Sequence, residues 1–315
     1  MTVRTFLEVV EIRTKIASVY PFLIGSLFSL SYFHQFQFGY TILFFVAMFL
    51  FDMTTTAINN YMDFEKAKSN DYKYQENVIG REHLDPVVIR NLIFGMLAIT
   101  AGIGLILSWL TGWLLLVLGG VVCFIGVFYT FGPIPLSRMP LGELFSGVTM
   151  GLGIFVITVY VNTVQAPIFF LDFQWKTGVF ALTGHFWQII AIILAAAPLV
   201  FTIADIMLAN NLRDLETDIK NHRYTLVYYI GRDQGILLFR LLMLACYLMI
   251  LLGLPFGVFG WPQLLVFLTF PKIRKNLRAH RQSLPHPKSF GYAIKNMILF
   301  NSVYAATFVV QLILR

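Results

Sequence analysis

Length, composition and charge exclude a soluble domain: of 315 residues 58% are hydrophobic and 12% charged, with a mean hydropathy of +0.74, whereas soluble domains carry about 25% charged residues. A net charge of +7 is found in many nucleic-acid-binding proteins, but here the basic residues lie between apolar stretches, as in the loops of a membrane protein. The chain is therefore expected to be an integral membrane protein.

Nine apolar stretches are candidates for membrane-spanning helices. About 30 Å of hydrocarbon requires roughly 20 helical residues, and the stretches lack the alternation of a β-barrel. They cover residues 16–33, 40–60, 88–109, 112–130, 141–161, 188–210, 234–254, 257–273 and 292–313. We predict an all-α fold, in which residues 1–315 form a single domain of nine transmembrane helices.

The positions of the basic residues predict the orientation of this bundle. If the chain crosses the membrane nine times, all of the 23 Lys and Arg residues except Lys176 and Arg315 fall on the side of the N-terminus. Because Lys and Arg are retained on the cytoplasmic face, the N-terminus is predicted inside and the C-terminus outside. The expected location is the cell membrane, with the chemistry on the cytoplasmic side.

The second stretch ends in a polar motif, residues 59–65, with the pattern NNxxDxE. On a helix Asn59 and Asn60 lie three or four residues from Asp63 and share its face. The same stripe continues back toward Asp52. Oxygen-bearing side chains therefore gather at the cytoplasmic end of this helix.

A proline-containing loop, residues 129–140, connects the fourth and fifth stretches on the same side of the membrane. Its three prolines make it stiff and non-helical. Tyr129 and Arg138 on such a loop are candidates for binding an acceptor substrate. The simpler alternative is that the loop only turns the chain.

The NNxxDxE pattern recurs at residues 210–216, at the end of the sixth stretch. Asn211, Asp214 and Asp218 share one helical face there. Glu65 and Glu216, equivalent in the two motifs, point away from their neighbouring aspartates. They are explained equally well as ion-pair partners of nearby Lys or Arg residues and as metal ligands.

Two oxygen-rich helix ends on one side of the membrane suggest one shared cation site. Carboxylate and amide oxygens suit Mg²⁺, which usually retains a substrate phosphate among its ligands. Lys and Arg beside the motifs suit the phosphate oxygens. The candidate diphosphate-binding residues are Lys15, Lys66, Arg81, Arg213 and Lys220.

These features together resemble the UbiA superfamily of intramembrane aromatic prenyltransferases, most closely its 1,4-dihydroxy-2-naphthoate polyprenyltransferase (MenA-like) branch. The resemblance covers nearly the whole chain. It includes the nine stretches, the two motifs, the Tyr-Thr-x-Gly-Pro-x-Pro-Leu loop that starts at Tyr129, and the opening residues 11–15. The second motif, followed by Thr225-Leu226, fits that branch well.

The first motif departs from the superfamily pattern NDxxDxxxD. Asn60 stands where the first Asp is expected, and Ala67 stands where the third is expected. Asp71, a few residues later, is the candidate replacement. The resemblance then implies Mg²⁺ ligands at both ends of the site, namely Asn59, Asn60, Asp63, Asp71, Asn211, Asp214 and Asp218.

The resemblance also implies the reaction. A polyprenyl group would pass from its diphosphate to 1,4-dihydroxy-2-naphthoate, with loss of diphosphate and CO₂, giving demethylmenaquinol for menaquinone biosynthesis. The catalytic residues would be Asp63, Asp71, Asp214 and Asp218.

Two alternatives remain open from the sequence. A relative of the same superfamily can use another acceptor, such as 4-hydroxybenzoate, homogentisate or haem. A cation-coupled transporter would instead use the intramembrane Asp52 and Asp205, although we expect Asp205 to make a structural hydrogen bond. The gathering of ligands at one face, rather than at mid-membrane, favours the enzyme.

Overall fold

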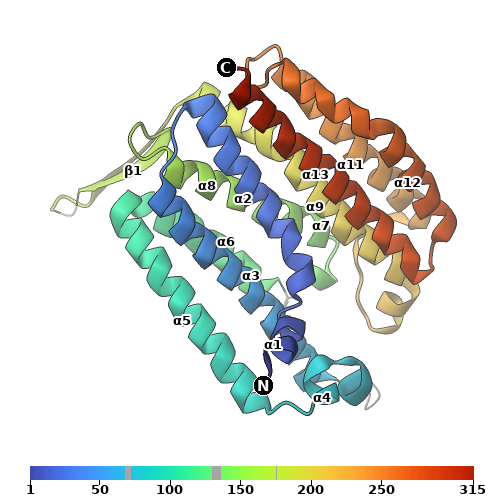
Figure 1. Ribbon diagram of the computed structural model, residues 1–315. Helices are drawn as coiled ribbons and strands as arrows, with labels where there is room; N and C mark the ends of the chain where they lie inside the picture. Colours follow the sequence, from blue (N-terminus) through green and yellow to red (C-terminus); the bar gives the residue numbers. More distant parts are fainter. Residues whose placement is uncertain (68–71, 130–135, 175) are drawn as a thin grey trace.

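The computed structural model describes residues 1–67, 72–129, 136–174 and 176–315, and it is a bundle of long helices with a short β-hairpin at one edge (Figure 1). In the described residues, seven helical segments are long and apolar enough to cross a membrane. They are Ile12–Phe33, Phe38–Lys66, Pro86–Thr111, Gly142–Asn162, Phe186–Lys220, Arg232–Gly253 and Pro287–Ile313. Six contain or form the helices α2 (Ile16–Phe28), α3 (Phe38–Lys66), α5 (Pro86–Thr111), α9 (Phe186–Lys220), α11 (Arg232–Gly253) and α13 (Phe290–Ile313).

The predicted fourth and eighth stretches are also helical, but they differ from the other seven. Helix α6 (Trp113–Phe128) is apolar and shorter. The eighth is a 3₁₀ helix, Trp261–Thr269, which continues as α12 (Phe270–Ser283). Lys and Arg residues are spread along α12. The combined helix Trp261–Ser283 is therefore apolar in its first part and basic in its second part.

Two of the spans are not uniform α-helices. The first passes from a 3₁₀ turn (Ile12–Lys15) through α2 to a π-helical turn (Ser29–Phe33). The span that corresponds to the predicted fifth stretch consists of α7 (Gly142–Ser146), a π-helical segment (Gly147–Gly153) and α8 (Ile154–Asn162). The remaining short helices are α1 (Val3–Val9), the π-helical turn Tyr72–Glu76, α4 (Val78–Arg81), the 3₁₀ turn Leu136–Arg138, α10 (Leu226–Ile230) and the 3₁₀ turn Pro287–Ser289.

Small residues allow a close helix contact between the π-helical segment Gly147–Gly153 and α9. A Cβ atom at Gly147 would lie 2.7 Å from the Val200 carbonyl oxygen, and one at Gly151 would lie 2.7 Å from the Val200 Cα. Because lipid is as apolar as a leucine side chain, close packing rather than hydrophobicity holds membrane helices together. The two glycines therefore fix how α9 sits against the fifth span.

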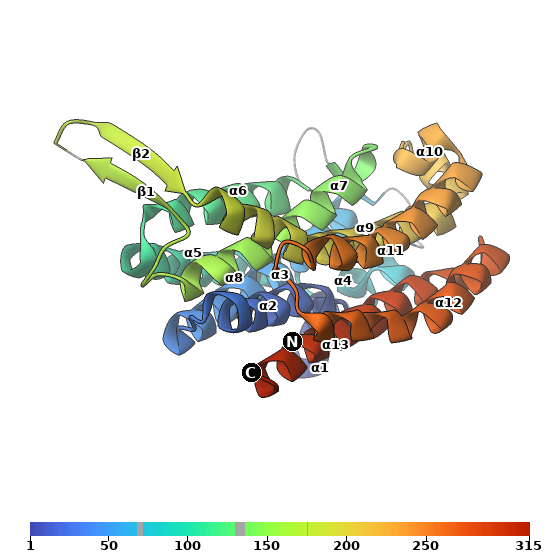
Figure 2. The ribbon, with the colours of Figure 1, turned by 90° about the horizontal axis from the view of Figure 1, so that it is seen from above.

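The buried side chains form one large cluster and two smaller ones. The large cluster joins α2, α9, α11 and α13, while a second joins α3, α5 and α6 with α8. The third lies around α1, α4 and the adjoining parts of α3 and α5. Figures 1 and 2 show the two larger groups of helices side by side, with α3 and α9 on different sides of the division.

The fold class was predicted correctly as helical, but one element was not predicted. Residues 162–187 were expected to be a loop, and they contain the antiparallel strands β1 (Phe169–Gln174) and β2 (Val179–Gly184). The hairpin extends from the edge of the bundle (Figure 2).

Candidate functional site

The two motifs lie near the ends of α3 and α9, and the guanidinium of Arg223 lies beside the second motif and within electrostatic range of the first. Arg223, in the turn after α9, interacts electrostatically with Asp63 of the first motif and Asp218 of the second. It also interacts with Tyr129 at the start of the proline-containing loop. The structure therefore brings together the three regions that the sequence singled out.

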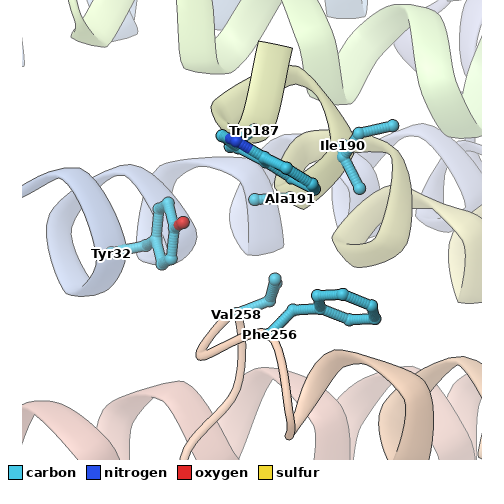
Figure 3. A pocket seen from close by; sticks show the side chains of 6 residues that line it. All are labelled: Tyr32, Trp187, Ile190, Ala191, Phe256 and Val258. Carbon is cyan, nitrogen blue, oxygen red and sulfur yellow. The ribbon is translucent and has the colours of Figure 1, made fainter. Parts of the chain in front are cut away.

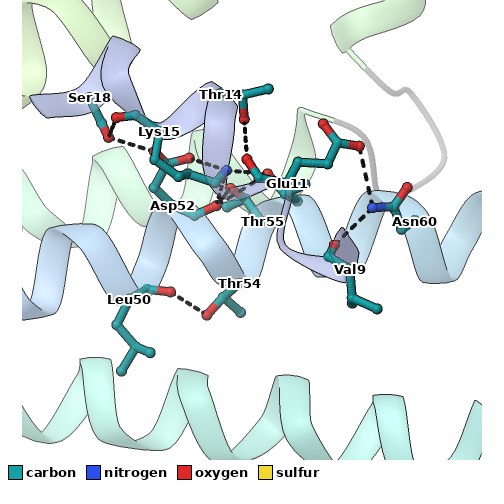
Figure 4. A network of polar contacts seen from close by, with 11 residues as sticks. Val9, Glu11, Thr14, Lys15, Ser18, Leu50, Asp52, Thr54, Thr55 and Asn60 are labelled. Atoms are coloured by element: carbon teal, nitrogen blue, oxygen red, sulfur yellow. Dashed lines mark hydrogen bonds and ion pairs between the residues drawn. The ribbon is translucent and has the colours of Figure 1, made fainter. Parts of the chain in front are cut away.

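In the first motif, the Asn60 side chain has a structural contact with the N-terminal segment. Its Nδ2 donates to the Val9 carbonyl oxygen at 2.9 Å and to Glu11 at 3.4 Å (Figure 4). The Asn60 carbonyl oxygen accepts a bond of 2.9 Å from Asn77. The Asn60 side-chain amide thus anchors α1 to α3, and its backbone carbonyl anchors the start of α4 to α3.

Asp63 is half-buried and lies near three cations. Arg223, Arg138 and Lys66 all act on its charge. Asn59, one turn earlier, is also half-buried. Asp71, the candidate third carboxylate, lies outside the described residues.

In the second motif, Asn211 is fully buried and donates to Glu143 Oε1 at 2.8 Å. In the part of the chain that the structure describes, Asn211 Oδ1 and Glu143 Oε2 have no hydrogen-bond partner. Because a buried oxygen without a partner costs about 1–3 kcal/mol, these atoms are suited to a cation or a donor that arrives with the substrate.

The two aspartates of the second motif are held by different arginines. Arg213 Nε donates to Asp214 Oδ1 at 2.6 Å, and Arg213 also bonds Asn210 at 2.7 Å. Asp218 is almost fully buried and lies 3.5 Å from Arg223 Nε. Its Oδ2 has no partner among the described residues.

Arg223 is the site residue that the sequence analysis did not select. It was one of several basic residues near the second motif, and membrane topology alone could explain it. The signal that could have found it is its distance of five residues from Asp218, just past a helix end. There the chain turns back, and the Arg223 N–H donates to the Asp218 carbonyl oxygen at 2.8 Å.

The five selected cations occupy different environments. Lys15 is buried, and its ammonium donates to Asp52 Oδ1 at 2.9 Å and to Thr56 (Figure 4). Arg81 pairs with Glu8 at 2.8 Å. Arg213 is bound to Asp214, as described above, and Lys66 and Lys220 are exposed. Of these five, the structure places Lys66 and Arg213 beside motif carboxylates.

Glu216 and Asp205 can also be placed. Glu216 forms two bonds with Arg232, at 2.7 and 2.8 Å, as expected for a carboxylate that points away from the site. Asp205 is buried, and within the described residues neither of its oxygens has a hydrogen-bond partner. The prediction that Asp205 makes a structural hydrogen bond is therefore wrong, because no donor among the described residues reaches its carboxylate oxygens.

Tyr129 lies at the base of the proline-containing loop, of which residues 130–135 are outside the described part. Its hydroxyl donates to the Gly142 carbonyl oxygen at 3.3 Å. Arg138, which is exposed, lies near Asp63.

The residues present fit a hard cation that is completed by a substrate. Among the described residues, no three His, Cys, Asp or Glu side chains converge as a ready-made metal cage. Asp63, Asp218 and Asn211 nevertheless offer only oxygen ligands, two of them with unpartnered buried oxygens. Mg²⁺ is commonly bound through one or two carboxylates plus phosphate and water, which is the kind of site these oxygens can form.

A cavity of about 290 Å³ lies elsewhere, lined by Tyr32, Trp187, Ile190, Ala191, Phe256 and Val258 (Figure 3). Its residues come from the opposite ends of the helices to those that carry the motifs. None of the site residues selected from the sequence lines it. It is therefore distinct from the candidate site.

Comparison with known proteins gives one family. The UbiA prenyltransferase family matches residues 18–274. The chain is 28% identical over 270 residues to a 1,4-dihydroxy-2-naphthoate octaprenyltransferase of Bacillus subtilis, covering 82% of this chain and 76% of the relative.

Solved structures have the same fold at low sequence identity. An apo UbiA homologue from Aeropyrum pernix has a TM-score of 0.66 at 14% identity, over 96% of this chain and 98% of that one. A UbiA homologue from Archaeoglobus fulgidus, bound to DMAPP and Mg²⁺, has a TM-score of 0.62 at 10% identity, over 97% and 99%.

Proposed function

The chain belongs to the UbiA prenyltransferase family, and on this basis we propose that it transfers a polyprenyl group from polyprenyl diphosphate to 1,4-dihydroxy-2-naphthoate. The C–O bond of the donor breaks and a C–C bond to the naphthoate ring forms. Diphosphate and CO₂ leave. The ring proton released at the alkylated carbon is balanced by the proton taken up at the carbon that loses CO₂, and the product is a demethylmenaquinol for menaquinone biosynthesis. The chain acts as one domain, with motifs at residues 59–71 and 210–218.

The observation that carries this proposal is Arg223, which lies 3.5 Å from Asp218 of the second motif and close enough to Asp63 of the first motif for their charges to interact. A guanidinium whose charge acts on carboxylates from both motifs supports the proposal that the two helix ends border one space. A diphosphate there can meet oxygen ligands from both helices through bound Mg²⁺. The homologue bound to DMAPP and Mg²⁺ supports this choice of ligands.

Mg²⁺, when bound, would neutralise charge that develops on the leaving diphosphate. Asn59, Asn60, Asp63, Asp71, Asn211, Asp214 and Asp218 are its proposed ligands. Arg223 and Lys66 would add positive charge next to the leaving group, and Asp63 or Asp71 would accept the proton. The helices on both sides exclude water, which would otherwise capture the allylic cation.

The acceptor is proposed from the name of the Bacillus subtilis relative and from the residues at the loop. The Tyr129 hydroxyl, whose proton is donated to Gly142, can accept a hydrogen bond from a hydroxyl of the acceptor, and Arg138 can pair with the acceptor's carboxylate. The alternative acceptors, 4-hydroxybenzoate, homogentisate and haem, require the same donor site. Only the loop side of the site distinguishes them.

A transporter is less well supported by the contacts of the intramembrane Asp52. Asp52 is paired with Lys15 at 2.9 Å and accepts a bond of 2.6 Å from Ser18. A carboxylate already neutralised by a buried ammonium is poorly placed to carry a cation across the membrane.

We further propose nine spans, with the N-terminus inside and the C-terminus outside, in the cell membrane. The support is the strong bias of Lys and Arg to one side of such a topology. The helices α6 and Trp261–Ser283 would be the spans beyond the seven found by length and composition. The site would then face the cytoplasm.

The experiment that tests this function is incubation of purified protein with Mg²⁺, farnesyl diphosphate and a panel of aromatic acceptors. Mass spectrometry would identify the product and CO₂ would be measured in parallel. We expect a prenylated, decarboxylated product from dihydroxynaphthoate. Conversion of only another acceptor would overturn the substrate, and absence of diphosphate release with every acceptor would overturn the reaction.

A further inference from the structure

The β-hairpin β1–β2 has one face made only of apolar residues and glycine. In an antiparallel pair, residues directly opposite each other share a face, and faces alternate along each strand. The pairs Phe169–Gly184, Leu171–Leu182 and Phe173–Phe180 therefore form one face. The opposite face holds all the polar residues of the two strands, and its members are Phe170, Asp172, Gln174, Val179, Ala181 and Thr183.

At its base, the apolar face packs against the ends of the membrane helices. The Phe169 ring stacks on Tyr160 of α8 with centroids 5.7 Å apart. Leu171 packs on the same buried cluster, which includes Leu114 of α6. The Tyr160 hydroxyl donates to the carbonyl oxygen of Thr111, the last residue of α5, at 2.9 Å. The apolar face is therefore directed toward the bundle.

Beyond the base, Phe180 and Leu182 on the same face are mostly exposed in the part of the chain that the structure describes. Phe180 is 68% exposed and Leu182 is 65% exposed, and Figures 1 and 2 show the hairpin extending sideways past the helices. An isolated two-stranded hairpin is at best marginally stable in water. A hairpin whose base is packed and whose tip exposes large apolar side chains requires an apolar surface beside the bundle.

The residues around the hairpin place it at a membrane–water boundary. Trp109, near the end of α5, is 79% exposed, and Phe186 and Trp187, at the start of α9, are 65% and 70% exposed. Aromatic side chains gather at the level of the lipid headgroups. The strands join the end of α8 to the start of α9, the end of the bundle opposite the aspartate motifs.

We propose that the hairpin is an interfacial element whose apolar face lies on the lipid beside α5 and α6. Leu182 and Phe180 enter the boundary between headgroups and acyl chains, while Asp172, Gln174 and Thr183 face water. The occupant of this face is lipid because the face continues, in the same direction, the contact of the hairpin base with membrane-spanning helices. This role concerns membrane attachment and does not depend on which reaction the protein catalyses.

The test uses neighbouring residues on opposite faces. Leu182→Cys and Thr183→Cys, each in full-length protein with Cys123→Ala, carry a nitroxide label in nanodiscs of phosphatidylglycerol and phosphatidylethanolamine. Cys246 is fully buried, and the Cys123→Ala protein alone gives the background signal. Electron paramagnetic resonance measures relaxation by oxygen, which concentrates in lipid, and by a nickel chelate, which stays in water.

We expect a several-fold higher ratio of oxygen to nickel accessibility at Leu182 than at Thr183. Equal ratios, with both labels open to nickel, would show that the hairpin stands in water and would overturn the proposal. Protection of Leu182 from both reagents together with spin–spin broadening would assign the face to a second copy and would also overturn it. Phe180→Cys and Ala181→Cys provide the same comparison if a Leu182 variant fails to fold.

Discussion

The two NNxxDxE motifs have the same residue pattern and different contacts. In the first, Asn60 fastens the N-terminal segment through Val9, and Asp63 lies among cations from three other positions. In the second, Asn211 is tied to Glu143 and Asp214 to its own neighbour Arg213. The pattern therefore fixes where the oxygens lie on a helix, but the surrounding helices decide which oxygens remain for a ligand.

The largest expected effect is at the second motif. Asp214→Ala and Asp218→Ala should each lower Mg²⁺-dependent release of diphosphate by about 10³-fold, because metal-assisted charge stabilisation is worth several kcal/mol. Glu216→Ala is the matched control in the same motif. Its carboxylate is bound to Arg232, and we expect it to keep most of the activity.

Thermal unfolding in detergent would verify that these three variants fold. Retained turnover in both aspartate variants would remove the second motif from the mechanism. Equal losses in all three variants would show that the whole helix end, rather than the aspartates, is required.

The next effect concerns Lys15, which pairs with Asp52 on the helix that carries the first motif. Lys15→Met should lower the free energy of unfolding by about 3–5 kcal/mol, because the largely buried Asp52 carboxylate loses its counter-charge. The measurement is thermal or chemical unfolding in detergent. Adding Asp52→Asn to Lys15→Met should restore most of the stability.

The opposite result would make Lys15 a direct ligand of the diphosphate. In that case Lys15→Met would unfold like the wild type and would raise KM for the prenyl diphosphate. The second substitution, Asp52→Asn, would then not restore activity.

Arg223 is expected to affect both motifs together. Arg223→Gln should lower kcat/KM by about 10–100-fold, corresponding to the loss of one charged hydrogen bond to the diphosphate, of about 1.5–3 kcal/mol. Arg232→Gln is the control, since it removes an arginine whose partner, Glu216, points away from the site. A loss no larger than that of the control would mean that the motifs do not share Arg223.

The smallest effect tests the departure of the first motif from the family pattern. Asn60→Asp removes the donor to the Val9 carbonyl oxygen and places a carboxylate beside Glu11. We expect a loss of about 1–3 kcal/mol in the free energy of unfolding. Thermal denaturation in detergent measures this loss. An unchanged stability with tighter Mg²⁺ binding would show that the two motifs are more alike than their contacts indicate.

The helices and the motifs could be predicted because both depend on local periodicity. A run of apolar residues identifies a span, and a spacing of three or four residues places Asn60 and Asp63 on one face. The direction of Glu216 follows from the same geometry, and its bond with Arg232 agrees with it.

The remaining features depend on contacts between distant parts of the chain. Lys15 meets Asp52 across 37 residues, and Glu143 meets Asn211 across 68, so no local pattern reveals either pair. The hairpin was hidden for another reason, because Phe169–Gln174 has too few polar residues to show a clear alternation within a predicted loop.

A double-mutant cycle on Asp63→Asn and Asp218→Asn tests the shared site most directly. Its readout is the Mg²⁺-dependent affinity for a non-hydrolysable farnesyl thiolodiphosphate, measured by calorimetry on the folded variants. If both carboxylates hold one diphosphate, each single variant should lose nearly as much affinity as the double variant, because groups that act as a unit are not additive. Losses that simply add would mean that the two helix ends bind independently, and would contradict the account.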